Sequence, residues 1–232
     1  MKRILVALLV VTMLVGSLPA FAAGKISVVQ ENFHVVDSYS IYGYAYAKVQ
    51  NVGDKPIKVN AGLLEIFDAE GDTLTSDDYL RSYAEYLQPD EYTYVCMDEK
   101  VEVEAVTEVD DYILTVSGKS DTGKRSIRLP VETSYEPDVK QGYSTYNYMT
   151  ALVTNDTEDT LFDITVLLVL LDDEDNILYM ESDSMYSSKG LTPGSSIVVR
   201  EDVSSSFMDY FAAKGYTPSK VDAIAYVNVS ND

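Results

Sequence analysis

The chain has 232 residues, of which 46% are hydrophobic and 19 are tyrosines, a composition that excludes an intrinsically disordered protein. Acidic residues outnumber basic residues by 38 to 17, so the net charge is −21, and such a surface repels nucleic acid and anionic lipid. The single cysteine, Cys96, excludes an intrachain disulfide, so a fold of this chain depends on its core alone.

The first 22 residues have the pattern of a secretory signal peptide. Lys2 and Arg3 form a positive n-region, an apolar run covers 4–15, and Ala20-Phe21-Ala22 is a small-residue cleavage pattern. The run is shorter than the roughly 18 residues of a membrane span, so an uncleaved anchor is the weaker alternative. We therefore expect cleavage after about Ala22, no membrane anchor afterwards, and a place outside the cell or in its envelope. Loss of Lys2 and Arg3 would leave 15 basic and 38 acidic residues, a net charge of −23.

Alternation with a period of two predicts strands after the leader. Ile41, Gly43, Ala45, Ala47 and Val49 alternate with tyrosine and polar residues, which is the pattern of a half-buried strand. Turn residues at 51–56, 68–72 and 87–91 separate further apolar runs, the last of which covers 112–116. Short strands at this spacing predict a β-sandwich.

The second half of the chain contains a strand with two apolar faces and one helix. The strand, Ile164 to Leu171, is apolar throughout except for Thr165, so both of its faces need a cover. The helix is predicted after 204–206, with three aromatic residues on one face and a glycine at its end: Phe207, Tyr210, Phe211 and Gly215. We expect this helix to be the cover, with a homodimer interface as the alternative.

A shift of 104 residues aligns the chain with itself over a long gap-free stretch. Val49-Gln-Asn51 falls on Val153-Thr-Asn155, and Leu87-Gln-Pro-Asp90 falls on Leu191-Thr-Pro-Gly194. The period is that of whole domains and not of solenoid units. We therefore predict an all-β protein with two tandem immunoglobulin-like β-sandwich domains, at 23–122 and 123–232. The Gly- and Ser-containing segment 117–124 is the expected linker.

These repeated motifs resemble the FxLYD domain, a small immunoglobulin-like sandwich of exported bacterial proteins. Leu64-Glu-Ile-Phe-Asp68 and Leu168-Val-Leu-Leu-Asp172 stand at the family's signature, with Leu in place of its Phe in both copies. Asn51 and Asn155 stand at the family's Asn, and Leu191-Thr-Pro-Gly194 stands at its later turn. The resemblance covers about half of each copy. It implies an envelope or secreted module and brings no catalytic residues.

Tyrosines form the most informative candidate surface. Tyr42, Tyr44 and Tyr46 lie on one side of their strand, and the shift of 104 places Tyr146 and Tyr148 at the first two of these positions. If the small residues between them face the core, the tyrosines form an outward strip that can stack on sugars or anchor a protein. The alternatives are cross-strand pairs that stabilise the sheet, or tyrosines that face the core.

A calcium site is the minority hypothesis for one acidic turn. Asp172, Glu174 and Asn176 place oxygen atoms at alternate positions, as a calcium-binding loop does. However, Ile177 stands where an EF-hand loop needs glycine, and the equivalent segment 68–72 reads as a hairpin turn. The sequence therefore favours a turn.

Catalytic motifs are not found in the sequence. It contains no G-x-S-x-G, Walker or H-E-x-x-H pattern, and a pairing of the lone His34 with Cys96 would need the two to meet in space. We expect no cofactor and a non-catalytic extracytoplasmic binding or scaffolding protein that contacts a protein or a cell-envelope glycan. The alternatives are a hydrolase with carboxylates in the cleft between the domains, and a structural spacer without a ligand.

Overall fold

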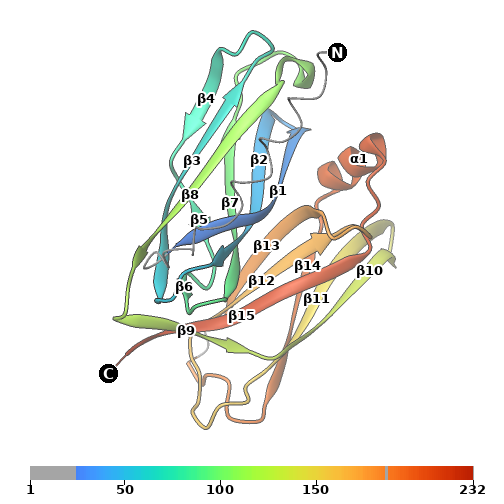
Figure 1. Cartoon of the computed structure of the whole chain (residues 1–232). Coiled ribbons are helices and arrows are strands. Elements are labelled where there is room, and N and C mark those ends of the chain that lie inside the picture. Colours follow the sequence, from blue (N-terminus) through green and yellow to red (C-terminus); the bar gives the residue numbers. More distant parts are fainter. Residues whose placement is uncertain (1–24, 186–187, 232) are drawn as a thin grey trace, which may run out of the picture.

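The computed structural model describes residues 25–185 and 188–231, so the expected signal peptide at 1–22 lies outside the described residues. The fold is all-β, as expected, with antiparallel sheets in two sandwiches and one helix (Figure 1). Strands of the first sandwich pair with one another, and so do strands of the second. The chain passes from the first sandwich to the second at residues 121–123. The expected linker of 117–124 is therefore too long, because strand pairing continues through Ser120 and resumes at Lys124.

The first sandwich consists of a four-stranded sheet in the order β1-β2-β7-β5 and a second sheet in the order β4-β3-β6, where β8 also pairs with β3. Its elements are β1 (Ile26–Asp37), β2 (Ile41–Asn51), β3 (Ile57–Phe67), β4 (Thr73–Asp77), β5 (Arg81–Ser82), β6 (Tyr86–Leu87), β7 (Tyr92–Lys100), a 3₁₀ turn (Val106–Glu108) and β8 (Asp111–Ser120).

The second sandwich repeats this plan. One sheet has the order β10-β11-β14 and the other has the order β13-β12-β15-β9. Its elements are β9 (Lys124–Leu129), β10 (Val131–Gln141), β11 (Ser144–Thr154), β12 (Ile164–Leu171), β13 (Ile177–Met185), β14 (Ser196–Asp202), α1 (Ser205–Lys214) and β15 (Lys220–Ser230).

Alternation along β2 separates the core of the first sandwich from the face behind it. Ala45, Ala47 and Val49 are fully buried between the two sheets of that sandwich. The intervening Tyr44 and Tyr46 point out of it, on the opposite side of the same sheet. Of the two orientations that the sequence left open, the small residues therefore face the core and the tyrosines face away from it.

Strand β12 is covered by the first domain on one face and by its own domain on the other. Val166, Leu168 and their even-numbered neighbours enter the core of the second sandwich. Leu167, Val169 and Leu171 form a second cluster with residues of the first domain, among them Tyr46, Tyr94 and Cys96. The prediction that the helix covers this strand was wrong, and no second copy of the chain is needed to cover it. The three-residue linker keeps the first domain close to the second, and an apolar face of the first domain covers this side of β12 instead.

Helix α1 begins and ends close to the predicted positions. Gly215 follows its last residue with a φ of 76°, the left-handed conformation that glycine adopts without strain. Phe207 and Phe211 are buried in the core of the second sandwich, and the helix also contacts β1 of the first domain. The helix therefore closes one end of the second core and borders the junction between the domains.

A buried asparagine holds the equivalent turn in each copy. The Nδ2 of Asn155 donates to the carbonyl oxygens of Asp159 and Leu191 at 2.8 and 2.7 Å, and its Oδ1 accepts from Thr157. Asn51 makes the corresponding bonds in the first copy. Both side chains are fully buried, which explains why the duplicated sequence retains this residue in a turn.

We expect Asn155→Ala to lower the free energy of unfolding by about 3 kcal/mol, because it leaves two buried carbonyl groups without donors. Urea denaturation measures the change. Asn60→Ala, at an exposed position of β3, is the matched control and should change stability by less than about 0.5 kcal/mol. Equal effects of the two substitutions would contradict the structural role of Asn155.

Candidate functional site

The junction between the domains carries polar contacts along β1. Three side chains at alternate positions reach the start of β13: Gln30 donates to the Asp175 carbonyl, and Asn32 and His34 contact the Ile177 carbonyl. On the other side of the junction, the Tyr94 hydroxyl donates to Asp222 at 2.6 Å. Together with the apolar cluster, these bonds fix the orientation of one domain against the other.

The first tyrosine strip lies at this junction and not on the free surface. Tyr46 is 2% exposed and belongs to the apolar cluster shared by the domains. Tyr44 is half-buried and packs against both this cluster and the core of the second domain. Tyr42 lies at the margin, half-buried, with its ring 6.0 Å from that of Tyr44. The expected outward strip is thus an interdomain surface at Tyr46, because the second domain packs on it.

The second pair of tyrosines remains partly open. Tyr146 and Tyr148 are half-buried on β11, and their rings stack with centroids 5.5 Å apart. Arg200 on β14 lies 3.7 Å from the centroid of Tyr148 and forms an ion pair with Glu136. The two tyrosine sets therefore occupy separate surfaces, one for each copy.

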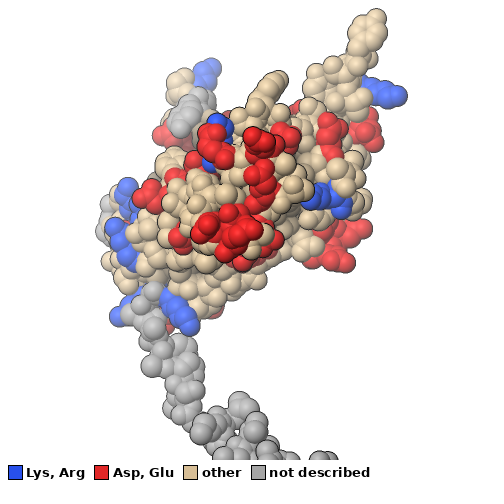
Figure 2. Space-filling view, turned by 90° about the horizontal axis from the view of Figure 1, so that it is seen from above, with Lys and Arg blue, Asp and Glu red and all other residues tan. Residues whose placement is uncertain are grey.

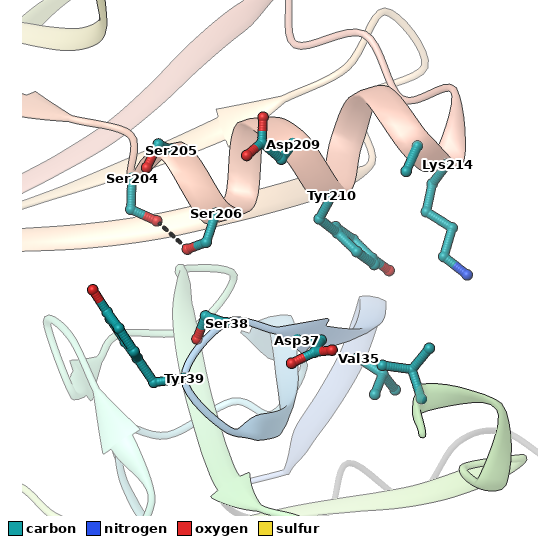
Figure 3. Close-up of a pocket in the computed structure, with 12 residues that line it drawn as sticks. Val35, Asp37, Ser38, Tyr39, Ser204, Ser205, Ser206, Asp209, Tyr210 and Lys214 are labelled. Carbon is teal, nitrogen blue, oxygen red and sulfur yellow. Dashed lines mark hydrogen bonds between the residues drawn. The ribbon is translucent and has the colours of Figure 1, made fainter. Parts of the chain in front are cut away.

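An outer groove runs between the β1–β2 hairpin and α1 (Figure 3). It has a volume of about 780 Å³ and combines aromatic rings, serine hydroxyls, two carboxylates and one ammonium group. Tyr39 at the hairpin and Tyr210 on the helix supply the rings. The polar groups come from Asp37, Ser38, Ser204, Ser205, Ser206, Asp209 and Lys214.

An inner pocket of about 410 Å³ lies between the domains and shares Ser204 and Ser206 with the outer groove. Its first-domain wall includes Tyr44, Tyr46, Arg81, Tyr83 and Cys96; its second-domain wall includes Tyr179, Met180, Glu181, Ser182 and Phe207. Of the described residues that line this pocket, Glu181 is the single carboxylate. This pocket therefore lacks the pair of acids that the hydrolase hypothesis requires, but Asp37 and Asp209 of different domains line the outer groove, so that hypothesis stays a prediction.

Two fully exposed tyrosines were missed by the sequence reasoning. Tyr39 and Tyr143 lie in the β1–β2 and β10–β11 turns, and both side chains are completely accessible to solvent. They are 104 residues apart, so the repeat itself contains the signal that could have identified them. Both turns lie toward the end that carries α1, because β14 pairs beside the β10–β11 hairpin and then leads into the helix.

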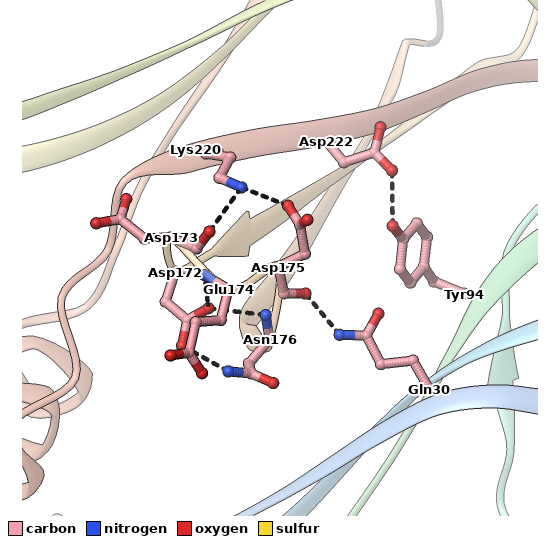
Figure 4. A network of polar contacts seen from close by, with 9 residues as sticks. All are labelled: Gln30, Tyr94, Asp172, Asp173, Glu174, Asp175, Asn176, Lys220 and Asp222. Atoms are coloured by element: carbon pink, nitrogen blue, oxygen red, sulfur yellow. Dashed lines mark hydrogen bonds and ion pairs between the residues drawn. The ribbon is translucent and has the colours of Figure 1, made fainter.

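The acidic turn proposed for calcium is a hairpin turn between β12 and β13 (Figure 4). Asp172 Oδ1 accepts from the backbone of Glu174 and Asn176, and Oδ2 accepts from the Asn176 side chain. Lys220 forms an ion pair with Asp175 in the same turn. Among residues 25–185 and 188–231, no group of three or more His, Cys, Asp or Glu side chains is arranged to hold a metal ion. The contacts thus favour the turn over a calcium site.

Cys96 and His34 do not form a dyad. His34 lies on β1 and Cys96 on β7, with β2 between them, so two strand spacings of roughly 4.8 Å separate them. The Cys96 thiol contacts Arg81 Nη2 at 3.0 Å, and burial raises its pKa to about 11. Such a thiol is protonated at neutral pH, which is the state of a structural cysteine.

Figure 2 shows one face of the molecule, on which Asp and Glu gather over the middle and Lys and Arg lie mainly at the margins. Within the described ranges, no helix has the length and hydropathy that a bilayer crossing requires.

No family model and no curated protein matches the sequence. The resemblance to the FxLYD family therefore stays a prediction.

His34 is buried in an aromatic environment at the junction. Its Nε2–H donates to the Ile177 carbonyl at 3.1 Å, and its Nδ1 lies 3.4 Å from the Tyr210 hydroxyl. The rings of Tyr46, Phe211 and Tyr216 surround it. Burial lowers the pKa of His34 to about 4, although the bond to Ile177 acts in the opposite direction.

We expect His34 to destabilise the native state progressively as the pH falls from about 6.5 toward 4. In this window the unfolded histidine binds a proton and the folded one does not, so protonation favours unfolding. Relative to His34→Phe, the wild type should lose about 2 to 3 kcal/mol between pH 7 and pH 4.5. Urea denaturation at both pH values measures the difference. Parallel pH profiles of the two proteins would contradict the buried neutral histidine.

Proposed function

We propose that this chain is a non-catalytic extracytoplasmic binding or scaffolding protein that grips a cell-envelope glycan at the end carrying α1. The single observation that supports this most strongly is the outer groove beside the fully exposed ring of Tyr39. Sugars offer an apolar ring face and many hydroxyl groups. Aromatic rings, serine hydroxyls and carboxylates together complement both features.

The duplication adds a second exposed aromatic side chain at the same end. Tyr143 occupies in the second copy the place that Tyr39 occupies in the first. Because apolar and polar contacts fix the two domains against each other, the distance between these rings is set by the fold. A polymer with repeating units could engage both rings at once, and the second contact would raise the apparent affinity without a new kind of site.

The proposal differs from the sequence expectation in the surface that it uses. The tyrosine strip of β2 contributes Tyr44 and Tyr46 to the inner pocket instead of an open sheet face. The net charge of −21 disfavours anionic polymers, so a neutral glycan is the expected class.

Co-sedimentation with insoluble cell walls and neutral polysaccharides tests this proposal. The chain from residue 23 should pellet with one of them, and Tyr39→Ala should reduce the bound fraction about tenfold, because a stacking contact is lost. Tyr79→Ala, which removes an exposed tyrosine that does not line the groove, should leave binding unchanged. If the parent chain stays in the supernatant with every polymer, the proposal of glycan binding is wrong. That result would favour the alternative of a structural spacer without a ligand.

A further inference from the structure

The inner pocket is lined by aromatic rings from both domains. Tyr44 and Tyr46 of β2 have ring centroids 6.3 Å apart, and Tyr44 meets Phe207 of α1 at 4.9 Å. Tyr179 of β13 lies 4.8 Å from the same Phe207 ring, and Tyr83 completes the wall from the segment before β6. Electron-rich faces assembled in this way attract organic cations, particularly substituted ammonium groups.

Charged groups of both signs stand in this pocket, one from each domain. Arg81 is half-buried, forms an ion pair with Asp98 and contacts the Cys96 thiol, both through its Nη2 atom. A guanidinium has five N–H donors, so further donors remain for a ligand carboxylate. On the opposite wall, the Glu181 carboxylate accepts a hydrogen bond from Tyr179 at 2.8 Å.

Two carboxylates outside the pocket lining, Asp183 and Glu201, lie near Glu181. Burial raises the pKa of Glu201, and the charges of Asp183 and Glu181 raise it further. A cation bound beside Glu181 would reduce the mutual repulsion of the three acids. On the first-domain side, the Arg81 guanidinium favours an anionic group of a ligand.

We propose that the inner pocket binds a small zwitterion, with its ammonium group against the tyrosine rings and Glu181 and its carboxylate on Arg81. Glycine betaine is the simplest molecule with this chemistry. A site of about 410 Å³ accepts a ligand of this size but not a long polymer. The site adjoins the proposed glycan groove at Ser204 and Ser206, but its binding residues differ, because Tyr39 lines only the groove and Arg81 lines only the pocket.

Isothermal titration calorimetry of the chain from residue 23 tests the proposal, with glycine betaine, choline and acetate as separate probes. Betaine should bind, and choline, which lacks the carboxylate, should bind at least tenfold more weakly. Acetate, which lacks the ammonium group, should give no measurable binding. Absence of betaine binding at millimolar concentration overturns the proposal, and so does choline binding as tightly as betaine.

Two substitutions locate the site. Glu181→Gln keeps the size of the side chain and should weaken betaine binding about tenfold, and Arg81→Leu should weaken it by a similar factor. Near-ultraviolet circular dichroism establishes that each variant is folded, and Glu181→Gln alone decides the matter if Arg81→Leu unfolds. Tyr39→Ala is the control and should bind betaine as the parent does. Betaine binding that is unchanged in Glu181→Gln overturns the assignment.

Discussion

The contact between the tyrosine-bearing face of β2 and β7 and the face of β12 and β15 that carries Leu167, Val169 and Ile224 determines the rest of this structure. Leu167, Val169 and Ile224 of the second domain are fully or almost fully buried against Tyr46 and Tyr94 of the first. Burial of each such aliphatic side chain contributes about 1.5 to 3 kcal/mol. The outer groove and the inner pocket both lie along this contact, so neither would exist in its present shape if the domains moved independently.

Differences between the two copies explain why only this pair of faces is buried. The shift of 104 makes Glu65 of the first copy equivalent to Val169 of the second. Thr115 pairs with Leu63 as Ile224 pairs with Leu167, so Thr115 is equivalent to Ile224. The first copy therefore presents a more polar version of the face that the second copy buries. In the same way, Thr150 and Arg200 of the second copy stand where the first has Tyr46 and Cys96. These polar and charged residues interrupt the apolar residues that remain exposed on the free faces, Leu63, Ile113 and Val198, which disfavours head-to-tail association.

Much of the fold could be predicted from the sequence, because its signals are local. Alternation along β2 separated the alanines from the tyrosines on opposite faces, the repeated asparagines marked equivalent turns, and Gly215 marked the end of α1. The residues that cover the outer face of a strand can be distant in sequence, so a local pattern does not identify them. Alternation placed Tyr46 on the face opposite the alanines. It could not indicate which of the two faces is the core, or that the second domain covers the other.

The candidate sites show the same division. Tyr39 and Tyr143 could have been found, since they are related by the repeat. The inner pocket could not, because Arg81 and Tyr83 come from the two-residue strand β5 and the loop after it, which show no alternating pattern, and they meet Glu181 only through the packing of the domains. Such a site becomes visible when the interface is known.

The reactivity of Cys96 tests the central claim most directly, because this lone thiol lies within the interdomain cluster and beneath Arg81. The measurement is the rate at which a bulky disulfide reagent modifies it in the native chain, compared with the chain in denaturant. The account predicts a native rate at least about a thousandfold slower, since the thiol is 3% exposed and its pKa is raised to about 11. A native rate close to that of the unfolded chain would show that the interface is open in solution and would contradict the account.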